Sequence, residues 1–391
     1  MYLRHQPNDA VGFRDSEHLR RLCPTMKFVI RRDSLVKPLA QVSGVVERRQ
    51  TLPILSNVLI RCDDQGVSLT GTDLEVELVG RVSGVAGVGG QVTVPARKFL
   101  DIVRELPEGA DVELELTEDR LTVRCGRFRS VLSTLPALEF PSVDRSSHDF
   151  SVEVSAPGLK RLLDRTGFAM AQQDVRHFLN GMLIEFGSDY LRAVATDGHR
   201  LAMSQLRDVE GLSERRQVIL PRKGIVELQR LLSDLDGSVK MNVGTNHLGV
   251  ETDDFSMTTK LIDGRFPDYD RVIPKDGDKV VVGDKLELRR ALSRTGILSN
   301  EKFRGIRVSV GRGVLTLLAH NPEQEEAEES LAVDYDGADV EVGFNVGYLQ
   351  DVLNAMDAER VRLTLRDGDS SALIESAEDE SSVYVVMPMK L

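Results

Sequence analysis

The residues best suited to chemistry lie in the segment ATDGHRLA, residues 195–202. Asp197 and His199 could act as an acid–base pair or as metal ligands. However, no Ser or Cys nucleophile motif accompanies them, and no second cluster of His, Asp or Glu has the spacing of a metal site. The order Asp-Gly-His suits a tight turn between two strands equally well. We therefore predict a turn, with no catalytic residue, metal or cofactor.

Two other segments invite a functional interpretation. The glycine-rich stretch GVAGVGG, residues 84–90, does not open a helix, and the strand after it contains Pro95. This arrangement favours a hairpin loop over a phosphate-binding loop. The acidic run NPEQEEAEE, residues 321–329, indicates a solvated edge when it is taken alone.

Length and charge limit the class of protein. The 391 residues suffice for two to four domains, and no apolar run approaches the roughly 20 residues of a membrane span. The formal net charge of −12 argues against broad nucleic-acid affinity, so any DNA contact needs a local basic surface. We expect residues 1–25 to be a poorly ordered extension before the start-like sequence MKFVIRRDSLV. The cysteines are far apart, which favours free thiols in a reducing cytosol: Cys23, Cys62 and Cys125.

The elements that must position these residues occur in three copies. Segments beginning LSNVLI, LNGMLI and RGIRVS each predict two strands joined by a polar turn, and their equivalent residues Val58, Met182 and Ile306 are 124 residues apart. Each pair is followed by a strand with a short amphipathic helix and then by a β-meander, and each copy opens with a strand that leads into a helix. We therefore predict an α+β fold built from three copies of one domain. Their expected bounds are residues 26–148, 149–277 and 278–391.

The predicted helices differ in charge from the rest of the chain. They span residues 33–50, 96–106, 156–178, 221–232, 284–304 and 345–357. Together they hold more Lys and Arg than Asp and Glu, although the whole chain is acidic and the sixth helix has no basic residue. Basic helices behind an acidic exterior would suit a ring around DNA. The simpler explanation is that Lys and Arg are good helix formers.

Motifs along the whole chain resemble one family. They include TLPILSNVLI, STLPALEFP, QQDVRHFLNGMLIE, VATDGHRLA, ILSNEKFRG, NPEQEEAEE, GFNVGYLQDVLNA and YVVMPMKL. From Met26 to Leu391 the sequence resembles the beta subunit of bacterial DNA polymerase III, the sliding clamp. The resemblance implies a ring-shaped, head-to-tail homodimer with three clamp domains per protomer, helices lining the inner wall and antiparallel sheets outside.

The resemblance also implies a function. The protein would be a cytoplasmic, non-enzymatic processivity factor whose closed ring encircles duplex DNA without reading its sequence. Its expected partners are the alpha subunit of the replicative polymerase, the clamp loader, and other clamp-binding polymerases and repair proteins.

Five residues are implied as DNA contacts. They are Arg49, Gln173, Arg176, His177 and Phe178. Family members often have tyrosines at the last two positions, so a hydroxyl-to-phosphate contact is in doubt there, although His177 could still donate. None of the five belongs to a base-reading constellation, which is consistent with sequence-independent phosphate contact.

The resemblance gives the acidic run a second role as one side of the dimer interface. The opposite side would be a basic surface of the first domain, and aliphatic residues would meet between them. The residues concerned are Lys98, Arg127, Arg129 and Leu132 on one side, and Ile297, Leu298, Glu323, Glu325, Glu326, Glu328 and Glu329 on the other. Such a charge-complementary, heterologous contact closes a ring if its rotation permits.

A hydrophobic peptide-binding pocket is the sharpest implication. The residues assigned to it are Leu179, Thr196, Gly198, His199, Arg200, Leu201, Pro267, Arg271, Val272, Asn345, Tyr348, Val385, Val386, Met387, Pro388, Met389 and Leu391. Independently of the resemblance, apolar residues that continue beyond the last strand suggest a binding surface, and Pro388 interrupts the strand ladder there. Methionine suits partners that vary, because its side chain adapts its shape. The alternative is that YVVMPMKL is only a last core strand.

Two other classes of protein remain open from the residues alone. One is an enzyme, such as a hydrolase, that works through Asp197 and His199; activity loss in Asp197→Ala with an intact ring would support it. The other is a monomeric scaffold without a DNA function, which the mass in solution would distinguish from a dimer.

Overall fold

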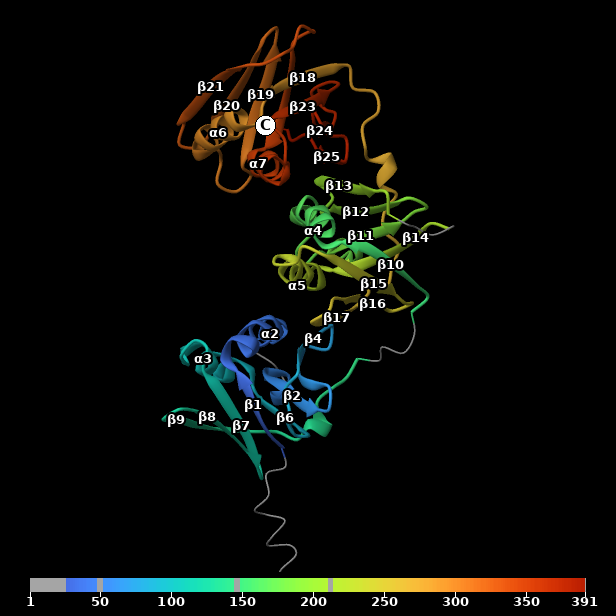
Figure 1. The fold of residues 1–391 in the computed structure, drawn as a ribbon. Coiled ribbons are helices and arrows are strands. Elements are labelled where there is room, and N and C mark those ends of the chain that lie inside the picture. Colours follow the sequence, from blue (N-terminus) through green and yellow to red (C-terminus); the bar gives the residue numbers. More distant parts are fainter. Residues whose placement is uncertain (1–25, 48–51, 144–147, 210–213, 391) are drawn as a thin grey trace, which may run out of the picture. The chain divides into compact units, whose positions relative to one another are not determined.

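The computed structural model describes residues 26–47, 52–143, 148–209 and 214–390 (Figure 1). The predicted extension at residues 1–25, together with Cys23, Arg49 and Leu391, therefore lies outside the described residues. The chain forms two compact units, which we call unit 1 (Met1–Ser146 with Gly249–Thr258) and unit 2 (Ser147–Leu248 with Thr259–Leu391). The predicted second and third domains share unit 2, apart from the segment that joins unit 1.

The first repeat begins with a strand and a helix and ends with a meander. Its elements are β1 (Met26–Arg31), α2 (Arg32–Val45), η1 (Pro53–Ser56), β2 (Asn57–Asp63), β3 (Gly66–Thr72), β4 (Val76–Ser83), β5 (Gly87–Val88), β6 (Gly90–Pro95), α3 (Ala96–Glu105), β7 (Asp111–Thr117), β8 (Arg120–Cys125), β9 (Phe128–Ser133) and η2 (Ala137–Glu139).

The second and third repeats follow the same order. The second contains β10 (Phe150–Ser155), α4 (Ala156–Asp164), η3 (Gly167–Ala169), η4 (His177–Leu179), β11 (Gly181–Phe186), β12 (Tyr190–Thr196), β13 (Arg200–Arg207), β14 (Arg216–Pro221), α5 (Arg222–Leu232), β15 (Ser238–Val243), β16 (His247–Glu251), β17 (Phe255–Lys260) and η5 (Tyr269–Arg271). The third contains β18 (Lys279–Asp284), α6 (Lys285–Thr295), η6 (Gly296–Leu298), β19 (Gly305–Gly311), β20 (Val314–His320), β21 (Glu326–Ala332), β22 (Val340–Asn345), α7 (Val346–Ala355), β23 (Arg360–Leu365), β24 (Ala372–Ser376) and β25 (Ser382–Val386).

Strand pairing confirms the repeat. The opening strand of each copy pairs antiparallel with the first strand of its meander, in β1–β7, β10–β15 and β18–β23. The second strand pairs with the strand before the second helix, in β2–β6, β11–β14 and β19–β22. The α+β architecture of three similar domains is therefore correct, and the equivalence of Val58, Met182 and Ile306 holds in the strand register.

The meander of one repeat extends the central sheet of the repeat before it. In unit 2 the strand order is β14-β11-β12-β13-β25-β24-β23-β18, so the last strand of the third repeat lies beside β13. In unit 1, β17 takes the corresponding place beside β4. The strands β9 and β21 stand at the edges of their sheets, each with one paired neighbour among the described residues.

Apolar periodicity explains the short helices. In α3 the residues Ala96, Phe99, Leu100 and Val103 are buried, which is the spacing of one helical face. In β7 buried residues alternate with less buried ones, because successive side chains of a strand point to opposite faces. These are the patterns from which the sequence predicts the elements.

Two predicted helices are too long. Instead of residues 156–178, α4 ends at Asp164, and the chain passes through the 3-10 turn η3 into a loop in which Gln173 has a φ of 57°. Instead of residues 284–304, α6 ends at Thr295, and the Ser299 hydroxyl donates to the carbonyl of Gly296 at 2.7 Å. In both places a hydroxyl side chain, of Thr166 or Ser299, donates to a backbone carbonyl, and a nearby glycine adds conformational freedom that disfavours a longer helix.

The glycine-rich stretch, predicted as a hairpin loop, contains a turn at Gly84 and the short edge strand β5. Gly87 and Val88 pair with β1 as the short strand β5. A Cβ at Gly87 would collide with the backbone of Lys27, so only glycine permits this approach. Among the described residues, no helix combines the length and apolar character needed to cross a membrane.

Candidate functional site

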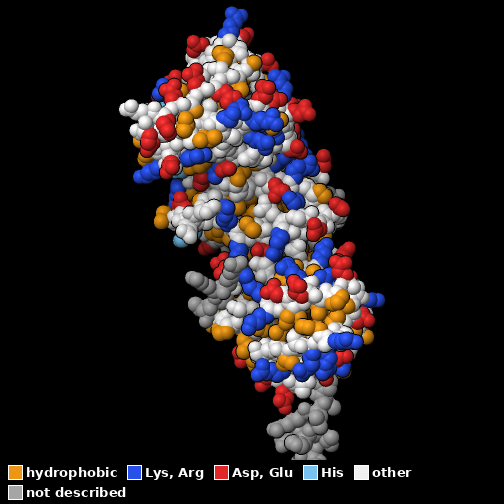
Figure 2. Space-filling view, turned by 90° about the vertical axis from the view of Figure 1, so that its left-hand side faces the viewer, with side chains coloured by type: hydrophobic (Ala, Val, Ile, Leu, Met, Phe, Trp, Pro, Cys, Tyr) orange, Lys and Arg blue, Asp and Glu red, His pale blue; other side chains and the backbone are white. Residues whose placement is uncertain are grey.

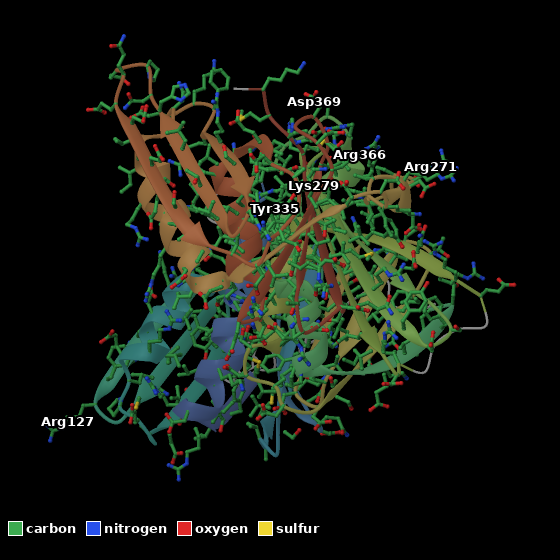
Figure 3. The ribbon with its side chains drawn as sticks, turned by 90° about the horizontal axis from the view of Figure 1, so that it is seen from above. Arg127, Arg271, Lys279, Tyr335, Arg366 and Asp369 are labelled. Atoms are coloured by element: carbon green, nitrogen blue, oxygen red, sulfur yellow. The ribbon has the colours of Figure 1, made fainter. Side chains whose placement is uncertain are left out.

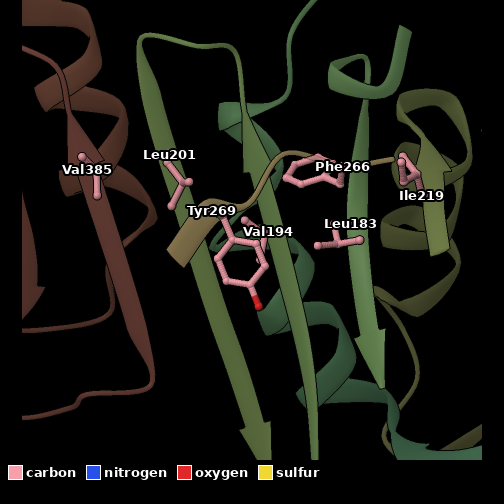
Figure 4. Packing of buried hydrophobic residues seen from close by; sticks show 7 residues of the cluster. All are labelled: Leu183, Val194, Leu201, Ile219, Phe266, Tyr269 and Val385. Atoms are coloured by element: carbon pink, nitrogen blue, oxygen red, sulfur yellow. The ribbon is translucent and has the colours of Figure 1, made fainter. Parts of the chain in front are cut away.

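A buried apolar cluster lies on one face of the second repeat (Figure 4). Strands β11, β12, β13 and β14 contribute inward-facing side chains, the segment before the third repeat covers them, and β25 adds one residue. We call this set the apolar cluster: Leu183, Val194, Leu201, Ile219, Phe266, Tyr269 and Val385. The half-buried side chains of Phe178 and Val272 pack against it. Val272 is one of the predicted pocket residues, whereas Phe178 is one of the predicted DNA contacts.

The chain end crosses the second and third repeats beside this cluster. The strand β25 stops at Val386, and the Met387 N–H then donates to the carbonyl of His199 at 2.9 Å. The Met389 N–H donates to the carbonyl of Gly343 at 2.8 Å. Met387 keeps 38% of its side chain exposed. Apolar residues therefore continue beyond the strand, as the sequence predicts.

The segment 195–202 forms a tight turn. One carboxylate oxygen of Asp197 accepts the N–H groups of His199 at 2.9 Å and Arg200 at 3.0 Å, and the other accepts from the Arg200 side chain at 3.0 Å. Gly198 has a φ of 89°, a conformation that favours glycine. The turn interpretation is confirmed, because the Asp197 carboxylate is occupied by its own turn. No group of three His, Cys, Asp or Glu side chains could hold a metal within the part of the chain that is described.

Arg200 joins this turn to the third repeat. Its guanidinium donates to Asp351 of α7 at 2.5 Å and to the carbonyl of Phe168 at 2.9 Å. It lies 4.6 Å from the ring centre of Tyr348, and the ring of His199 stacks on the same tyrosine at 6.3 Å. Burial raises the pKa of Tyr348, so its hydroxyl is protonated at neutral pH. The result is a rigid aromatic and cationic wall beside Met387.

The predicted pocket residues divide by exposure. Four of them are buried and form what we call the floor of the peptide surface: Leu179, Leu201, Val385 and Val386. The exposed or half-exposed ones form what we call the peptide surface: Thr196, Gly198, His199, Arg200, Pro267, Arg271, Val272, Asn345, Tyr348, Met387, Pro388 and Met389. Arg271 points away from the protein (Figure 3) and pairs with Asp268 at 2.9 Å. Asn345 is the N-cap of α7, since its side chain accepts the N–H groups of Gly347 and Tyr348.

A groove also opens against the other end of the apolar cluster. Its volume is about 330 Å³, and Leu183, Ile219 and Phe266 of the cluster line it together with Gly264 and Arg265. None of the predicted pocket residues lines this groove. A ligand that follows the cluster could therefore reach beyond the predicted residues.

Of the four described DNA candidates, Gln173 and Arg176 lie on a loop, and His177 and Phe178 lie in the short 3-10 turn η4 instead of in the predicted long helix. Gln173, Arg176 and His177 are exposed, whereas Phe178 packs against the apolar cluster. The Arg176 guanidinium donates twice to Asp174, at 3.0 and 2.9 Å, and holds the pKa of that carboxyl at about 2. Arg176 also lies against Gly198, because a Cβ there would be 3.1 Å from its guanidinium. The DNA candidates are thus neighbours of the peptide surface.

A second basic surface was missed among the DNA candidates. A groove of about 460 Å³ lies between α6 and α7 and is lined by Arg289, Arg290, Ser293, Arg294, Gln350 and Asn354. The arginines recur at the spacing of one helical face, which is a signal that the sequence contains. Phosphate oxygens are natural ligands for such donors.

The dimer candidates lie on edge strands or beside them. Lys98 is exposed on α3, and Arg127 projects from the turn between β8 and β9 (Figure 3). On β9 Arg129 is exposed, but Leu132 is only 7% exposed and belongs to the core of its own sheet. The exposed apolar residues of this edge are instead Phe128 and Val131.

In the third repeat Ile297 is 75% exposed, whereas Leu298 is half-buried. The acidic residues Glu323, Glu325, Glu326 and Glu328 are exposed on or beside β21. Glu329 is half-buried and pairs with Arg294 of α6, which lowers the pKa of Glu329. On the face shown in Figure 2, acidic and basic side chains lie side by side, so the expected separation of charge is not visible there.

Similarity to known proteins defines the class. The three domains of the DNA polymerase III beta subunit match in order, with the N-terminal domain at residues 26–144, the central domain at 153–268 and the C-terminal domain at 270–390. A three-domain DNA clamp is therefore the class that the fold and the repeats define.

Relatives extend this result over nearly the whole chain. The beta sliding clamps of Pseudomonas aeruginosa and Escherichia coli K12 are 54% and 50% identical to it over 367 residues, which is 94% of this chain and 100% of each relative. A crystal structure of the Pseudomonas aeruginosa subunit superposes with a TM-score of 0.91, covering 93% of this chain and all of that one. The chain belongs to the DNA polymerase III beta subunit family, the beta sliding clamps, and its function is that of a DNA clamp.

Proposed function

We propose that the peptide surface binds short extended peptides of replication proteins and so tethers the replicative polymerase to DNA. The observation that carries this proposal is the apolar cluster, which is bordered by Met387 beyond the last strand and by the wall of Arg200 and Tyr348. Apolar anchors of a peptide would contact Val272 and Met387, and a polar side chain would find donors in His199 and Arg200. The clamp loader and other clamp-binding polymerases and repair proteins would share the same surface.

The exposed methionine gives the sharpest test. Met387→Ala should weaken the binding of a fluorescein-labelled peptide that has one glutamine and two leucine anchors. The expected loss is about 2 kcal/mol, or roughly thirty-fold in the dissociation constant. The fold should be unaffected, because the Met387 side chain is more than one-third exposed. Leu286→Ala is the matched control, since Leu286 is 41% exposed, lies on α6 and is not a residue of the peptide surface. Unchanged anisotropy titrations for Met387→Ala, or an equal loss for both variants, would place the peptide elsewhere.

A closed dimer follows from the way in which the repeats join. Within one chain, β17 lies beside β4 and β25 lies beside β13. Their equivalents, β9 and β21, each have one edge that pairs with no other strand in the described part of the chain. Pairing β9 of one protomer with β21 of its partner would repeat the same joint and close a head-to-tail ring.

The charges of these two edges are complementary. Arg127 and Arg129 flank the apolar residues of β9, and the acidic run of the third repeat lies on or beside β21. Opposite charges on facing patches steer association and specify the partner strand. The exposed Ile297 supplies an apolar contact at this end of the protomer.

Contact with DNA would be electrostatic and independent of sequence. The loop with Gln173, Arg176 and His177 and the groove between α6 and α7 offer donors to phosphates. Because a closed ring cannot leave duplex DNA sideways, weak contacts suffice and sliding costs little. The protein would act in the cytoplasm on DNA and would have no catalytic activity of its own.

A further inference from the structure

One buried carboxylate is absent from the functions described so far. Glu185 lies near the end of β11 with 0% of its side chain exposed. Its oxygens accept hydrogen bonds from the hydroxyl of Tyr190 at 2.7 Å, from the amide of Gln217 at 2.6 Å and from the hydroxyl of Tyr269 at 3.0 Å. Arg215 also donates to it, and Arg192 lies at 3.4 Å. We call these six residues the Glu185 network.

The network keeps Glu185 charged and its tyrosines protonated. Burial by itself would raise the pKa of Glu185, but the hydrogen bonds it accepts, first from Gln217 and Tyr190, outweigh burial and lower that pKa. Burial raises the pKa of Tyr269 to about 12, so its hydroxyl remains a donor. Arg192 in turn donates to the Tyr269 oxygen at 2.8 Å. Each of the five partner residues therefore donates at least one hydrogen bond to Glu185, in an environment where an unpaired charge would be costly.

Tyr269 connects this network to the peptide surface. Its ring belongs to the apolar cluster and lies beside Leu201 and Val194 in Figure 4, while its hydroxyl donates to Glu185. Tyr269 also begins the 3-10 turn η5, which contains Arg271. The Val272 N–H closes that turn by donating to the Tyr269 carbonyl at 3.0 Å. The position of Val272 thus depends on where the tyrosine is held.

The fold itself does not require this network. The strand register makes Arg61 and Ser309 the equivalents of Glu185 in the other two repeats. Glu185 pairs with the third residue of β12, Arg61 pairs with the third residue of β3, and Ser309 pairs with the third residue of β20. Arg61 is exposed and Ser309 is half-exposed, and Arg61 borders an open groove of about 800 Å³ in unit 1. Two copies of the domain therefore fold without a buried carboxylate here. The copy that has one is the second repeat, which contains the apolar cluster beside the peptide surface.

We propose that Glu185 is a positioning residue for the peptide surface. It fixes the Tyr269 hydroxyl and thereby holds η5 and Val272 in the place where a peptide anchor packs. This inference rests on the proposed peptide function, because it assigns the network to that same surface. Glu185 itself touches no peptide.

Two tyrosines allow the positioning role to be separated from a purely structural one. Tyr190 and Tyr269 both donate their hydroxyls to Glu185, but only Tyr269 belongs to the turn beside Val272. Tyr269→Phe and Tyr190→Phe each remove one oxygen and keep the ring. Both should lower the melting temperature slightly, since each removes one buried hydrogen bond. Only Tyr269→Phe should weaken the labelled peptide, by about fivefold.

Methyl NMR of Val272 supplies a readout that does not need peptide. The Val272 methyl signals should shift in Tyr269→Phe and in Glu185→Gln, but not in Tyr190→Phe. In a double-mutant cycle, Glu185→Gln combined with Tyr269→Phe should lose no more affinity than the stronger single variant, because both break the same link. Should Tyr269→Phe fail to fold, Glu185→Gln decides the question in the same two assays.

The outcomes separate this inference from the proposed function. Equal losses of affinity in Tyr269→Phe and Tyr190→Phe, or unmoved Val272 signals in Tyr269→Phe, would overturn the positioning role. If the wild-type protein does not bind the peptide at all, the proposed function fails. The Val272 signals would then still show whether Glu185 positions the turn.

Discussion

At the scale of single residues, charged side chains in this clamp are mostly engaged locally. Asp197 anchors its own turn, Arg200 spans two repeats, and Asp174 holds Arg176 beside Gly198. An arginine that is already paired is a weaker partner for phosphate, because part of its charge is neutralised. The loop is therefore expected to bind DNA less tightly than its basic residues suggest.

Asp174→Asn should strengthen DNA binding by releasing Arg176. The slope of the logarithm of the affinity against the logarithm of the salt concentration should become steeper by about one, because one additional counterion is released. Anisotropy titrations of a DNA duplex at several salt concentrations measure this slope. Asp268→Asn is the matched control, because it releases Arg271, which is not a DNA candidate. An unchanged slope in Asp174→Asn would exclude Arg176 from the DNA contact.

The same pair sets a pH dependence. The pKa of Asp174 is lowered by the hydrogen bonds from Arg176 to about 2, below the usual value for aspartate of about 3.9. A carboxyl with a lowered pKa in the folded state contributes stability above its unfolded pKa, and this contribution is lost as the pH falls through about 2. The Asp174 carboxyl should therefore stay unprotonated down to about pH 3, and its NMR chemical shift should stay constant to that pH. A midpoint near 3.9 would show that the pair does not persist in solution.

At the scale of elements, the N-terminal end of α7 accounts for Asn345 and Tyr348, which the resemblance assigns to the peptide-binding pocket. Asn345 caps α7, as Ser155 caps α4 and Asp284 caps α6. A side-chain oxygen at this position satisfies N–H groups that have no partner within the helix. Asn345 thus accepts the N–H group of Tyr348, and its first role is to stabilise the start of α7.

Asn345→Ala should lower the free energy of unfolding by about 1 kcal/mol, because the cap of α7 is lost. Asn345→Asp keeps the acceptor oxygen and adds a negative charge at the helix N-terminus, so it should stay close to the wild type in stability. Urea denaturation of both variants measures the difference, and the peptide titration should follow the same order. If Asn345→Asp lost as much peptide affinity as Asn345→Ala, the amide itself would contact the peptide.

At the scale of the whole molecule, the repeat leaves two complementary edges unused. The strand β9 has basic and apolar side chains, whereas β21 lies in an acidic segment. Free edges of this kind pair with other chains unless they are protected. In a closed dimer, β9 of each protomer would pair with β21 of its partner, so that all four edges would have a neighbour.

Ile297→Ala should weaken the dimer by about 2 kcal/mol, or roughly thirty-fold in its dissociation constant. The protomer should keep its stability, because Ile297 is mostly exposed in it. Sedimentation over a dilution series measures the effect. Leu138→Ala in unit 1 is the control, since Leu138 is 92% exposed and lies outside the proposed interface. A nanomolar dimer that Ile297→Ala does not change would rule out this interface.

The ring itself predicts a topological behaviour on DNA. Protein loaded onto closed circular DNA should remain bound, whereas it should slide off linear DNA whose ends are open. Gel filtration of the two complexes at moderate salt measures retention. Equal retention on both forms would contradict the topological mechanism and favour direct binding.

The sequence alone determined the parts that depend on local pattern. The 124-residue spacing and the strand alternation are local and periodic, so they revealed three copies of one domain and the order of their elements. The tight turn at Asp197 was likewise readable, because Asp and Gly have strong turn preferences. Helix ends were less certain: α4 and α6 stop early where polar side chains compete for backbone hydrogen bonds.

Only the tertiary structure decided which residues meet. The isolated Glu185 in an apolar strand was a visible signal, but its partners Tyr190, Gln217 and Tyr269 come from different elements, and no local pattern specifies such contacts. The same holds for the burial of Leu132, which depends on how its own sheet packs. Long-range packing and hydrogen bonding arise from the arrangement of sheets, and that arrangement separates the floor of the peptide surface from the residues left in contact with solvent.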